Sequence, residues 1–159
     1  MAAYIPPQLC TAADRPPVGS AWRHEIKYDG YRAQLVVAGG RAWLFSRNGL
    51  DWTHRFPELA QEAAGLPNCV IDGEVVVLDE QGRPDIEAFL ASLSSGRTSD
   101  LVLMAVDVLM IEGEDLRGLP YEERRARLEA LVDCCDGPAC DHIAVVDSHR
   151  ADGPSPRAM

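Results

Sequence analysis

Short runs rich in apolar, β-branched and aromatic residues recur along the chain, separated by polar and turn-forming residues. Such runs, when turn residues bound them, are typical of β-strands. Such runs predict strands at residues 22–28, 31–38, 41–47, 69–79 and 142–148. Gly39 and Gly40, between the second and third runs, indicate a tight β-hairpin turn.

Three other segments follow the spacing of helices instead. They cover residues 54–65, 86–96 and 119–135. The last is the clearest because Pro120 stands at its start and acidic residues fill its first turn. Its apolar face is predicted to consist of Leu128, Leu131, Val132 and Cys135.

Residues 101–111 form a mostly apolar run that fits either a buried strand or a buried helix. Its three valines and the turn sequence EGED that follows favour a strand. Hairpins interleaved with helices predict an α+β fold, with mainly antiparallel sheets and flanking helices. We expect an extended lead-in over residues 1–20, one domain over 21–147 and a polar tail over 148–159.

The composition is that of a globular protein, with 47% apolar and 25% charged residues. No apolar run approaches the ~20 residues that a membrane-spanning helix needs. The N-terminal sequence has neither the basic start nor the apolar stretch of a signal peptide. We therefore expect a cytoplasmic protein without a membrane partner.

The net charge of −10 argues against a simple nucleic-acid binder, but the charge is unevenly distributed. Residues 1–57 contain seven Lys or Arg against four Asp or Glu, whereas residues 58–159 contain eight against twenty-one. The first third of the chain is thus the part suited to phosphate groups. The acidic remainder is expected to be a solvated surface that weakens binding to DNA.

The five cysteines do not suggest a disulfide framework, because their number is odd. The stretch CCDGPACDH, from Cys134 to His142, raises the alternative of a zinc site. It lacks paired C-x-x-C spacing, so packed or free thiols are the favoured interpretation.

Residues suited to chemistry gather in three short clusters near strand ends and turns. Lys27, the only lysine, begins the first, K-Y-D-G, and Arg32 follows it. The second is S-R-N-G, which contains Arg47, and the third is D-G-E, which ends at Glu74. Each cluster alone fits an exposed turn or a solvated charge. Together, an amine nucleophile, two arginines for phosphate and a carboxylate for ribose or metal are what nucleotidyl transfer requires.

In this order the three clusters resemble motifs I, Ia and III of ATP-dependent DNA ligases. These enzymes belong to the covalent nucleotidyltransferase superfamily, whose adenylation domain has an ATP-grasp-like fold. The stretches EIKYDGYR, LFSRNGLDWTHRFPEL, IDGEVVVLDEQGRPD and VDVLMIEGEDLRGLPYEERRARLEAL are most similar to the ligase module of bacterial DNA ligase D. The likeness runs from about Trp22 to Val132, within the expected domain 21–147.

The resemblance implies roles for the residues of the first cluster. Lys27 would form a lysyl–AMP phosphoramidate, which explains why lysine rather than arginine stands there. Glu25 would help to bind adenine, chiefly through its backbone. Asp29 and Arg32 would position the ribose and the phosphates. Because an ordinary lysine is protonated at pH 7, a neighbouring metal ion or arginine would have to lower the pKa of Lys27.

The resemblance assigns the remaining site residues to the nucleotide and its metal ion. Arg47 would contact the nucleotide or the 5′-phosphate of a nick, and Glu74 would bind the ribose or assist the metal. Val106 stands where these ligases usually carry an aromatic residue that stacks on adenine, so base stacking is expected to be weaker here.

The chemistry implied by the resemblance uses ATP with Mg²⁺ or Mn²⁺ and seals DNA in repair or recombination. Lys27 attacks the α-phosphorus of ATP, AMP passes to a DNA 5′-phosphate, and the adjacent 3′-hydroxyl displaces AMP. The expected partners are nicked or broken double-stranded DNA, with a separate C-terminal segment or repair proteins as further possibilities. The protein would be associated with the nucleoid when bound to DNA.

The sequence lacks the family's motif IV, motif V and OB-fold domain, so the adenylation domain is expected to be incomplete. We expect at most weak self-adenylation and no nick sealing by the chain alone. The alternative is a non-catalytic, ligase-like remnant that binds nucleotide or a partner. An RNA ligase or capping enzyme is a third interpretation, disfavoured by the stretch SRNGLDWTHRFPEL.

Overall fold

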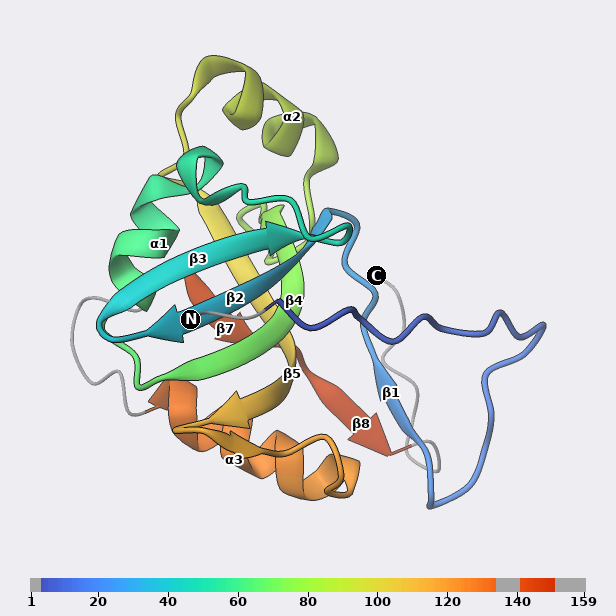
Figure 1. The fold of residues 1–159 in the computed structure, drawn as a ribbon. Helices are drawn as coiled ribbons and strands as arrows, with labels where there is room; N and C mark the ends of the chain where they lie inside the picture. Colours follow the sequence, from blue (N-terminus) through green and yellow to red (C-terminus); the bar gives the residue numbers. More distant parts are fainter. Residues whose placement is uncertain (1–3, 134–140, 151–159) are drawn as a thin grey trace. The chain divides into compact units, whose positions relative to one another are not determined.

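The computed structural model describes residues 4–133 and 141–150, which fall into two compact units. Unit 1 joins the start of the chain, through Pro7, to the long segment Tyr28–Val145. Unit 2 joins Gln8–Lys27 to the segment that begins at Val146. Figure 1 shows both units with their elements labelled, and each unit is described by itself.

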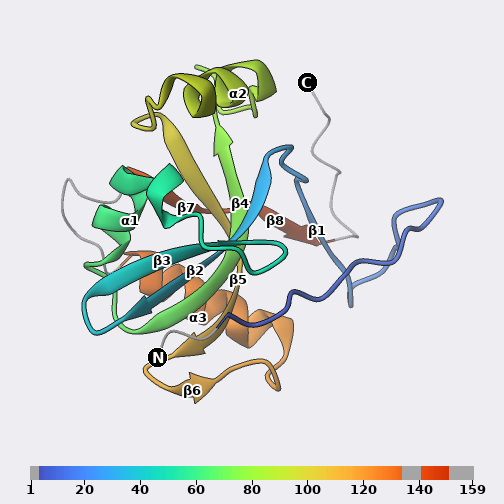
Figure 2. The same ribbon diagram turned by 45° about the horizontal axis from the view of Figure 1, so that its top comes forward.

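Unit 1 is built on a sheet with the strand order β3-β2-β4-β5-β6, in which each neighbouring pair is antiparallel. A further strand, β7, pairs with β5 in the parallel direction. Figure 2 shows the hairpin of β2 and β3 beside β4. The strands are β2 (Tyr31–Ala38), β3 (Arg41–Ser46), β4 (Cys69–Val77), β5 (Leu101–Ile111), β6 (Glu114–Asp115) and β7 (Ile143–Val145).

The helices of unit 1 begin and end at residues that favour helix ends. Asp85 caps the start of α2 by accepting a hydrogen bond from the Ala88 backbone N–H at 2.9 Å, and Gly96 ends it in the left-handed region. Pro57 stands in the first turn of α1, where its missing N–H costs nothing. The helical elements are η1 (Thr53–Arg55), α1 (Pro57–Ala63), α2 (Ile86–Ser95) and α3 (Tyr121–Asp133).

The two faces of the sheet have different chemistry because side chains alternate along each strand. One face supplies Leu35 and Ile71 to a core that includes Phe56 before α1, Phe89 of α2 and Leu128 of α3. The helices therefore pack on the apolar face of the sheet. The opposite face, here called the polar face, carries the intervening residues of β2 and β4: Arg32, Gln34, Asp72 and Glu74.

Unit 2 contains a two-stranded antiparallel ladder of β1 (Arg23–Glu25) and β8 (Ser148–Arg150). Glu25 lies opposite Ser148 in this ladder. The His24 imidazole lies 2.9 Å from the Pro17 carbonyl oxygen, which ties the strand to the segment before it.

The structure confirms the α+β fold, the hairpin at Gly39 and Gly40, and the assignment of residues 101–111 to a strand. It differs at the periphery. The strand expected over 22–28 covers only three residues, and the one expected over 142–148 is divided between β7 and β8. Residues 148–150 were expected in a polar tail, but their backbone pairs with β1, and backbone pairing does not require an apolar pattern.

Leu128 and Leu131 of α3 are buried, as the helical pattern predicts, while Cys135 lies outside the described residues. In the part of the chain that the structure describes, no helix has both the length and the apolar character required to cross a membrane.

Gly73 lies in close contact with β5. A Cβ atom at this position would lie 2.6 Å from the Met104 carbonyl oxygen and 2.9 Å from Cδ1 of Leu103. The pairing of β4 with β5 shifts register beside Gly73, so β5 has one more residue than β4 there. The absence of a side chain therefore permits both the close approach and the bulge.

We expect Gly73→Ala to lower the free energy of unfolding by about 1–3 kcal/mol, because the methyl group would force the two strands apart. Urea denaturation measures the change. Gly118→Ala is the matched control, since a Cβ atom there meets nothing within 4 Å. Equal midpoints for the two variants would contradict the close packing of β4 on β5.

Candidate active site

The polar face of the sheet brings two of the three candidate clusters into register. Arg32, at the start of β2, is the direct cross-strand partner of Glu74 on β4. Paired residues of an antiparallel ladder project to the same side, so both side chains belong to this face. The first and third clusters, 42 residues apart in the sequence, are thereby neighbours.

Arg32 is held by Asp72, which is the first residue of the D-G-E cluster. Its Nε donates to Oδ1 of Asp72 at 3.2 Å, and its Nη2 donates to Oδ2 at 2.5 Å. The side chains are 30% and 12% exposed, so the pair is largely removed from water. The two parallel contacts fix the plane of the guanidinium group.

Glu74 is tied to the loop that follows Lys27. Its Oε1 accepts a hydrogen bond from the Gly30 backbone N–H at 3.2 Å. Gly30 must be glycine in this conformation, because a Cβ atom would collide with the Val75 carbonyl group. The contact fixes the K-Y-D-G stretch, at its Gly30 end, to the D-G-E stretch.

Arg47 lies in a tight turn that leaves β3. The Ser46 N–H donates to the Leu50 carbonyl at 2.8 Å, and the Leu50 N–H donates back to the Ser46 hydroxyl oxygen at 3.1 Å. Gly49 has a φ of +78°, which this turn requires and which glycine adopts without strain. The turn holds the Arg47 backbone in one conformation.

Residues near the start of the chain fasten this turn to the polar face. The Tyr4 hydroxyl donates to the Arg47 carbonyl oxygen at 2.5 Å, and the Tyr4 ring lies 5.9 Å from that of Phe45. The Gln34 amide exchanges two hydrogen bonds with the backbone of Ile5, each 2.7 Å long. Figure 1 shows this first segment passing across β2.

The two arginines predicted to bind phosphate border a narrow crevice on the polar face, which is too tight in this structure to admit a water molecule. Arg32 and Arg47 both line it, although 14 residues separate them in the sequence. Its full lining is Tyr4, Pro7, Arg32, Ala33, Gln34, Ser46, Arg47 and Asp72.

Val106 occupies a bulge in β5. The register passes from Asp72 opposite Asp107 to Gly73 opposite Ala105, which leaves Val106 without a partner on β4. Bulges reorient a side chain relative to the regular strand and are common beside active sites. Val106 is half-buried, and its aliphatic side chain offers an apolar surface but no ring.

Asp107, the residue after the bulge, is anchored from α3. Arg124 donates to the Asp107 carboxylate at 2.8 and 2.9 Å and to the Leu119 carbonyl oxygen at 2.7 Å. Hydrogen bonding by Asp107 raises the pKa of the Arg124 guanidinium, while partial burial opposes that rise. The helix thereby stabilises the strand next to Val106.

Glu25 and Lys27 belong to unit 2. Glu25 ends β1, and Lys27 is the last residue of that unit's first segment. Asp29 follows in unit 1, one residue before Gly30. The structure therefore unites Arg32, Arg47 and Glu74 in one sheet region, while the grouping of Glu25 and Lys27 with them stays a prediction from the sequence.

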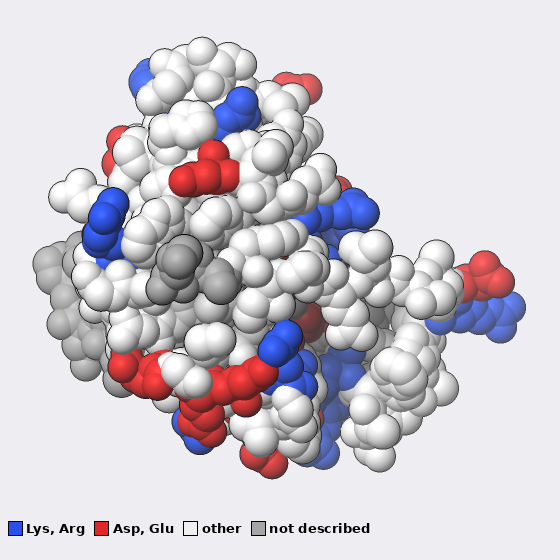
Figure 3. All heavy atoms as spheres, viewed as in Figure 1, with Lys and Arg blue, Asp and Glu red and all other residues white. Residues whose placement is uncertain are grey.

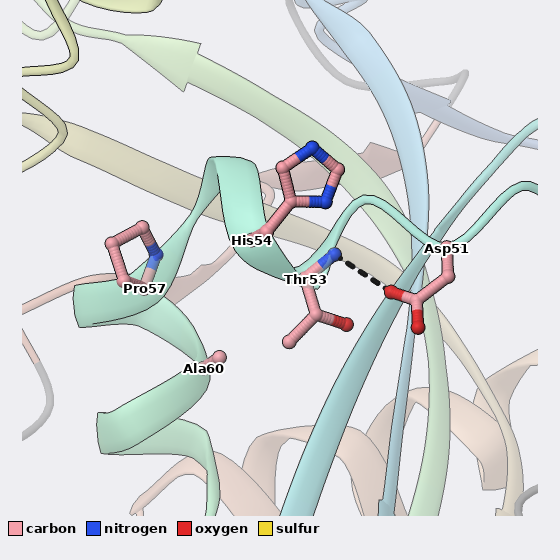
Figure 4. Close-up of a pocket in the computed structure, with 5 residues that line it drawn as sticks. All are labelled: Asp51, Thr53, His54, Pro57 and Ala60. Atoms are coloured by element: carbon pink, nitrogen blue, oxygen red, sulfur yellow. Dashed lines mark hydrogen bonds between the residues drawn. The ribbon is translucent and has the colours of Figure 1, made fainter.

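A wider hollow of unit 1 lies away from this site. It has a volume of about 550 Å³ and is open to solvent. Figure 4 shows the Asp51 carboxylate accepting a hydrogen bond from the Thr53 backbone N–H, at 2.9 Å, and the His54 ring pointing away from it. Hydrogen bonding from Thr53 holds the pKa of Asp51 below its usual value. None of the residues that line this hollow is a predicted site residue. They are Asp51, Thr53, His54, Pro57 and Ala60.

Among the described residues, no group of three or more His, Cys, Asp or Glu side chains could hold a metal ion by itself. Most of the stretch proposed as a zinc alternative, Cys134 to Cys140, lies outside the described residues. Cys69 is buried, and burial raises the pKa of its thiol to about 12, with a smaller contribution from the Glu112 charge. This thiol is a packing residue.

The sequence did not reveal several contacts that support the site. Asp72 was visible in the D-G-E cluster, but its pairing with Arg32 depends on strand register. Tyr4 and Gln34 had no recognisable pattern, because their contacts join segments about 30 to 40 residues apart. The Asp107–Arg124 pair likewise joins a strand to a later helix.

Comparison with known proteins places most of the chain in one family. The family model for the ATP dependent DNA ligase domain matches residues 8–153. The multifunctional non-homologous end joining protein LigD of Pseudomonas aeruginosa is 44% identical over 135 residues, which are 84% of this chain and 16% of the relative. The bifunctional LigD of Bacillus subtilis is 33% identical over 141 residues, 78% of this chain and 23% of the relative.

Solved structures show the same likeness in three dimensions. A mycobacterial DNA ligase D complexed with ATP and MES matches with a TM-score of 0.64 and 32% identity, over 82% of this chain and 41% of the solved one. The ligase domain of Mycobacterium tuberculosis LigD matches with a TM-score of 0.63 and 33% identity, over 81% and 40%. The chain thus spans about two fifths of these structures and less than a quarter of the two curated relatives.

We expect Asp72→Asn to lower the free energy of unfolding by about 1–3 kcal/mol, because it removes the charge of a carboxylate that makes two hydrogen bonds to the partly buried Arg32. Asp115→Asn is the matched control. It breaks an Arg–Asp pair of similar geometry whose side chains are 53% and 49% exposed, so its midpoint should stay unchanged. Urea denaturation measures both variants. Equal shifts of the two urea midpoints would contradict the expectation that the more buried pair contributes more to stability.

Proposed function

The chain belongs to the ATP dependent DNA ligase domain family, and on that premise we propose that it performs the first step of ligation, the transfer of AMP from ATP to Lys27. The resemblance read from the three sequence motifs is thereby confirmed at the level of the family. The adenylation step itself, the residues that perform it and the DNA substrate are parts of the proposal.

One observation carries this proposal. Two arginines that the motifs assign to phosphate line a common crevice, and a carboxylate assigned to ribose or metal is the cross-strand partner of one of them. Arg47 supplies a guanidinium group that suits bidentate contact with phosphate, and the guanidinium of Arg32 is held in a fixed orientation by Asp72. Glu74 supplies oxygen ligands on the same face.

The donor set fits a magnesium–nucleotide complex. Mg²⁺ is usually bound by one or two carboxylates together with substrate phosphates, and it keeps several waters. Glu74 would provide such a carboxylate, and the triphosphate would complete the coordination, since the described residues form no metal cluster of their own. When bound, the ion would offset the negative charge that develops on the phosphates.

In the proposed step, the Nζ atom of Lys27 attacks the α-phosphorus of ATP. A P–N bond forms, the bond between the α-phosphorus and the bridging oxygen breaks, and pyrophosphate leaves with that electron pair. The proton of the amine passes to solvent. Arg32 and Arg47 would hold the phosphates in line, and Asp29 would hold the ribose. The adenylate would then pass to the 5′-phosphate of nicked or broken DNA.

A non-catalytic nucleotide-binding domain is the second candidate. Val106 favours it, because an aliphatic residue stands where a ring would stack on adenine. The same geometry then serves to bind nucleotide or a partner without transfer.

We expect wild-type protein, incubated with α-labelled ATP and Mg²⁺ or Mn²⁺, to acquire acid-labile label, and Lys27→Arg to acquire none. Arginine keeps the positive charge but does not form the phosphoramidate under these conditions. Lys27 is the only lysine, so loss of label in this variant assigns the bond to its side chain. Unlabelled wild-type protein that binds nucleotide would favour the non-catalytic candidate, and equal labelling of both proteins would reject Lys27.

We expect Val106→Phe to lower the ATP concentration that gives half-maximal labelling by about fivefold or more. Stacking of a base on an aromatic ring contributes roughly 1–3 kcal/mol. The position in a bulge of β5 gives the larger side chain room to adjust. Val102→Phe, a change of the same size on β5, is the control. A concentration unchanged in Val106→Phe would remove this position from the base-binding site.

A further inference from the structure

Ten arginines lie in the described part of unit 1, and six of them are held by carboxylates. Arg124 pairs with Asp107, for example, and Arg117 with Asp115. The other held arginines are Arg32, Arg83, Arg125 and Arg127. The remaining four have no carboxylate within ion-pair distance among the described residues, and they are Arg41, Arg47, Arg55 and Arg97.

Two of these four arginines stand at the two ends of β3, the edge strand of the sheet. Arg41 begins β3, and Arg47 follows its last residue. Six residue steps at about 3.3 Å each separate them by roughly 20 Å. Trp43 and Phe45 lie between them on the polar face, because they are the cross-strand partners of Val36 and Gln34. By alternation Arg41 belongs to the same face.

Arg41 is held in place without being neutralised. Its guanidinium carbon lies 5.2 Å from the centre of the Trp43 ring. A stacked guanidinium uses one face of its plane for the ring, while its N–H donors point outward along that plane. Ordering the side chain in advance lowers the entropy cost of a later contact with an anion. Arg41 is exposed, so such an anion has access.

The charge of the surrounding surface also favours an anion at β3. In Figure 3, acidic side chains gather along the lower edge of the molecule, over β6, whereas the band over β3 shows mainly uncharged and basic side chains. The acidic edge includes Glu112, Glu114 and Asp115, all of them exposed. A polyanion would be repelled from the β6 edge and would find uncompensated positive charge along β3.

We propose that β3 is a contact track for the DNA backbone, in which the Arg41–Trp43 pair binds a phosphate away from the nick while Arg47 is at the reacting end. The inference rests on the proposed function, which supplies DNA as the polyanion. A DNA strand carries about one phosphate per 3.4 Å of helix axis, so ~20 Å of β3 corresponds to about six base pairs. The contact positions duplex DNA and reads no sequence.

The test compares two exposed arginines, Arg41, which is stacked on Trp43 at the start of β3, and Arg117, which is held by Asp115 away from β3. Binding of a fluorescent nicked duplex with a 5′-phosphate is measured by anisotropy, at salt concentrations from about 50 to 200 mM, for the full chain, Arg41→Gln and Arg117→Gln. Both variants change the net charge by the same amount at an exposed position. Only Arg41→Gln should weaken binding, by roughly two- to fivefold at low salt, and lower the slope of log affinity against log salt by about one.

Arg41→Lys refines the result, because it keeps the charge but loses the planar stacking group. It should restore the salt slope and only part of the affinity. Equal weakening by Arg41→Gln and Arg117→Gln would show a response to net charge alone and would overturn the track. Unchanged binding in Arg41→Gln, or no binding by the wild-type chain, would overturn it as well.

Nucleotide labelling of the wild-type chain without DNA, run in parallel, separates this inference from the proposed function. Label without binding to the duplex rejects only the track. Binding that depends on Arg41, in a chain that acquires no label, supports the track as a DNA contact and rejects the adenylation step.

Discussion

The two-residue alternation of β2 and β4 is the constraint on which the rest of unit 1 depends. It sends Leu35 and Ile71 into the core beneath the helices and sends Arg32 and Asp72 to the opposite face. Slippage of the register by one residue would place charges in the core and leucine in the crevice. Burial of the apolar face therefore does more than stabilise the sheet, because it also fixes which side chains can meet on the polar face.

The D-G-E cluster shows how this constraint divides tasks among adjacent residues. Asp72 neutralises and orients Arg32, Gly73 allows β5 to approach, and Glu74 accepts from the Gly30 N–H. The two carboxylates are on the same face, and the position between them, which alternation assigns to the core side, is occupied by Gly73. A guanidinium held by Asp72 keeps its plane fixed, and fixed donors stabilise developing charge more effectively than mobile ones. Arg32 is thus better described as a preorganised group than as a flexible one.

The sequence predicted the parts of this fold that depend on local pattern. The hairpin turn at Gly39 and Gly40, the end of α2 at Gly96 and the buried face of α3 all follow from residue types at short spacing. The contacts of Tyr4 with Arg47 and of Arg124 with Asp107 did not follow, because they join distant segments through single side chains. The strand β8 escaped prediction for a related reason, since its partner β1 lies more than 100 residues away. Motif order identified the family, whereas the bulge at Val106 required the register of two strands.

The distribution of ion pairs gives the acidic composition a structural meaning. A net charge of −10 opposes association with DNA only if positive and negative groups are mixed evenly. In unit 1 they are not, because carboxylates hold Arg117, just after β6, and the arginines of α3, whereas those at the two ends of β3 have no carboxylate within ion-pair distance among the described residues. An exposed ion pair contributes little to stability, but it removes an arginine from competition for phosphate. Pairing near β6 and on α3 therefore leaves the uncompensated positive charge of the described unit 1 to four arginines, two of which stand at the ends of β3, beside the crevice that contains Arg32 and Arg47. A chain with this arrangement can be acidic overall and still present a defined cationic edge to a nucleic acid.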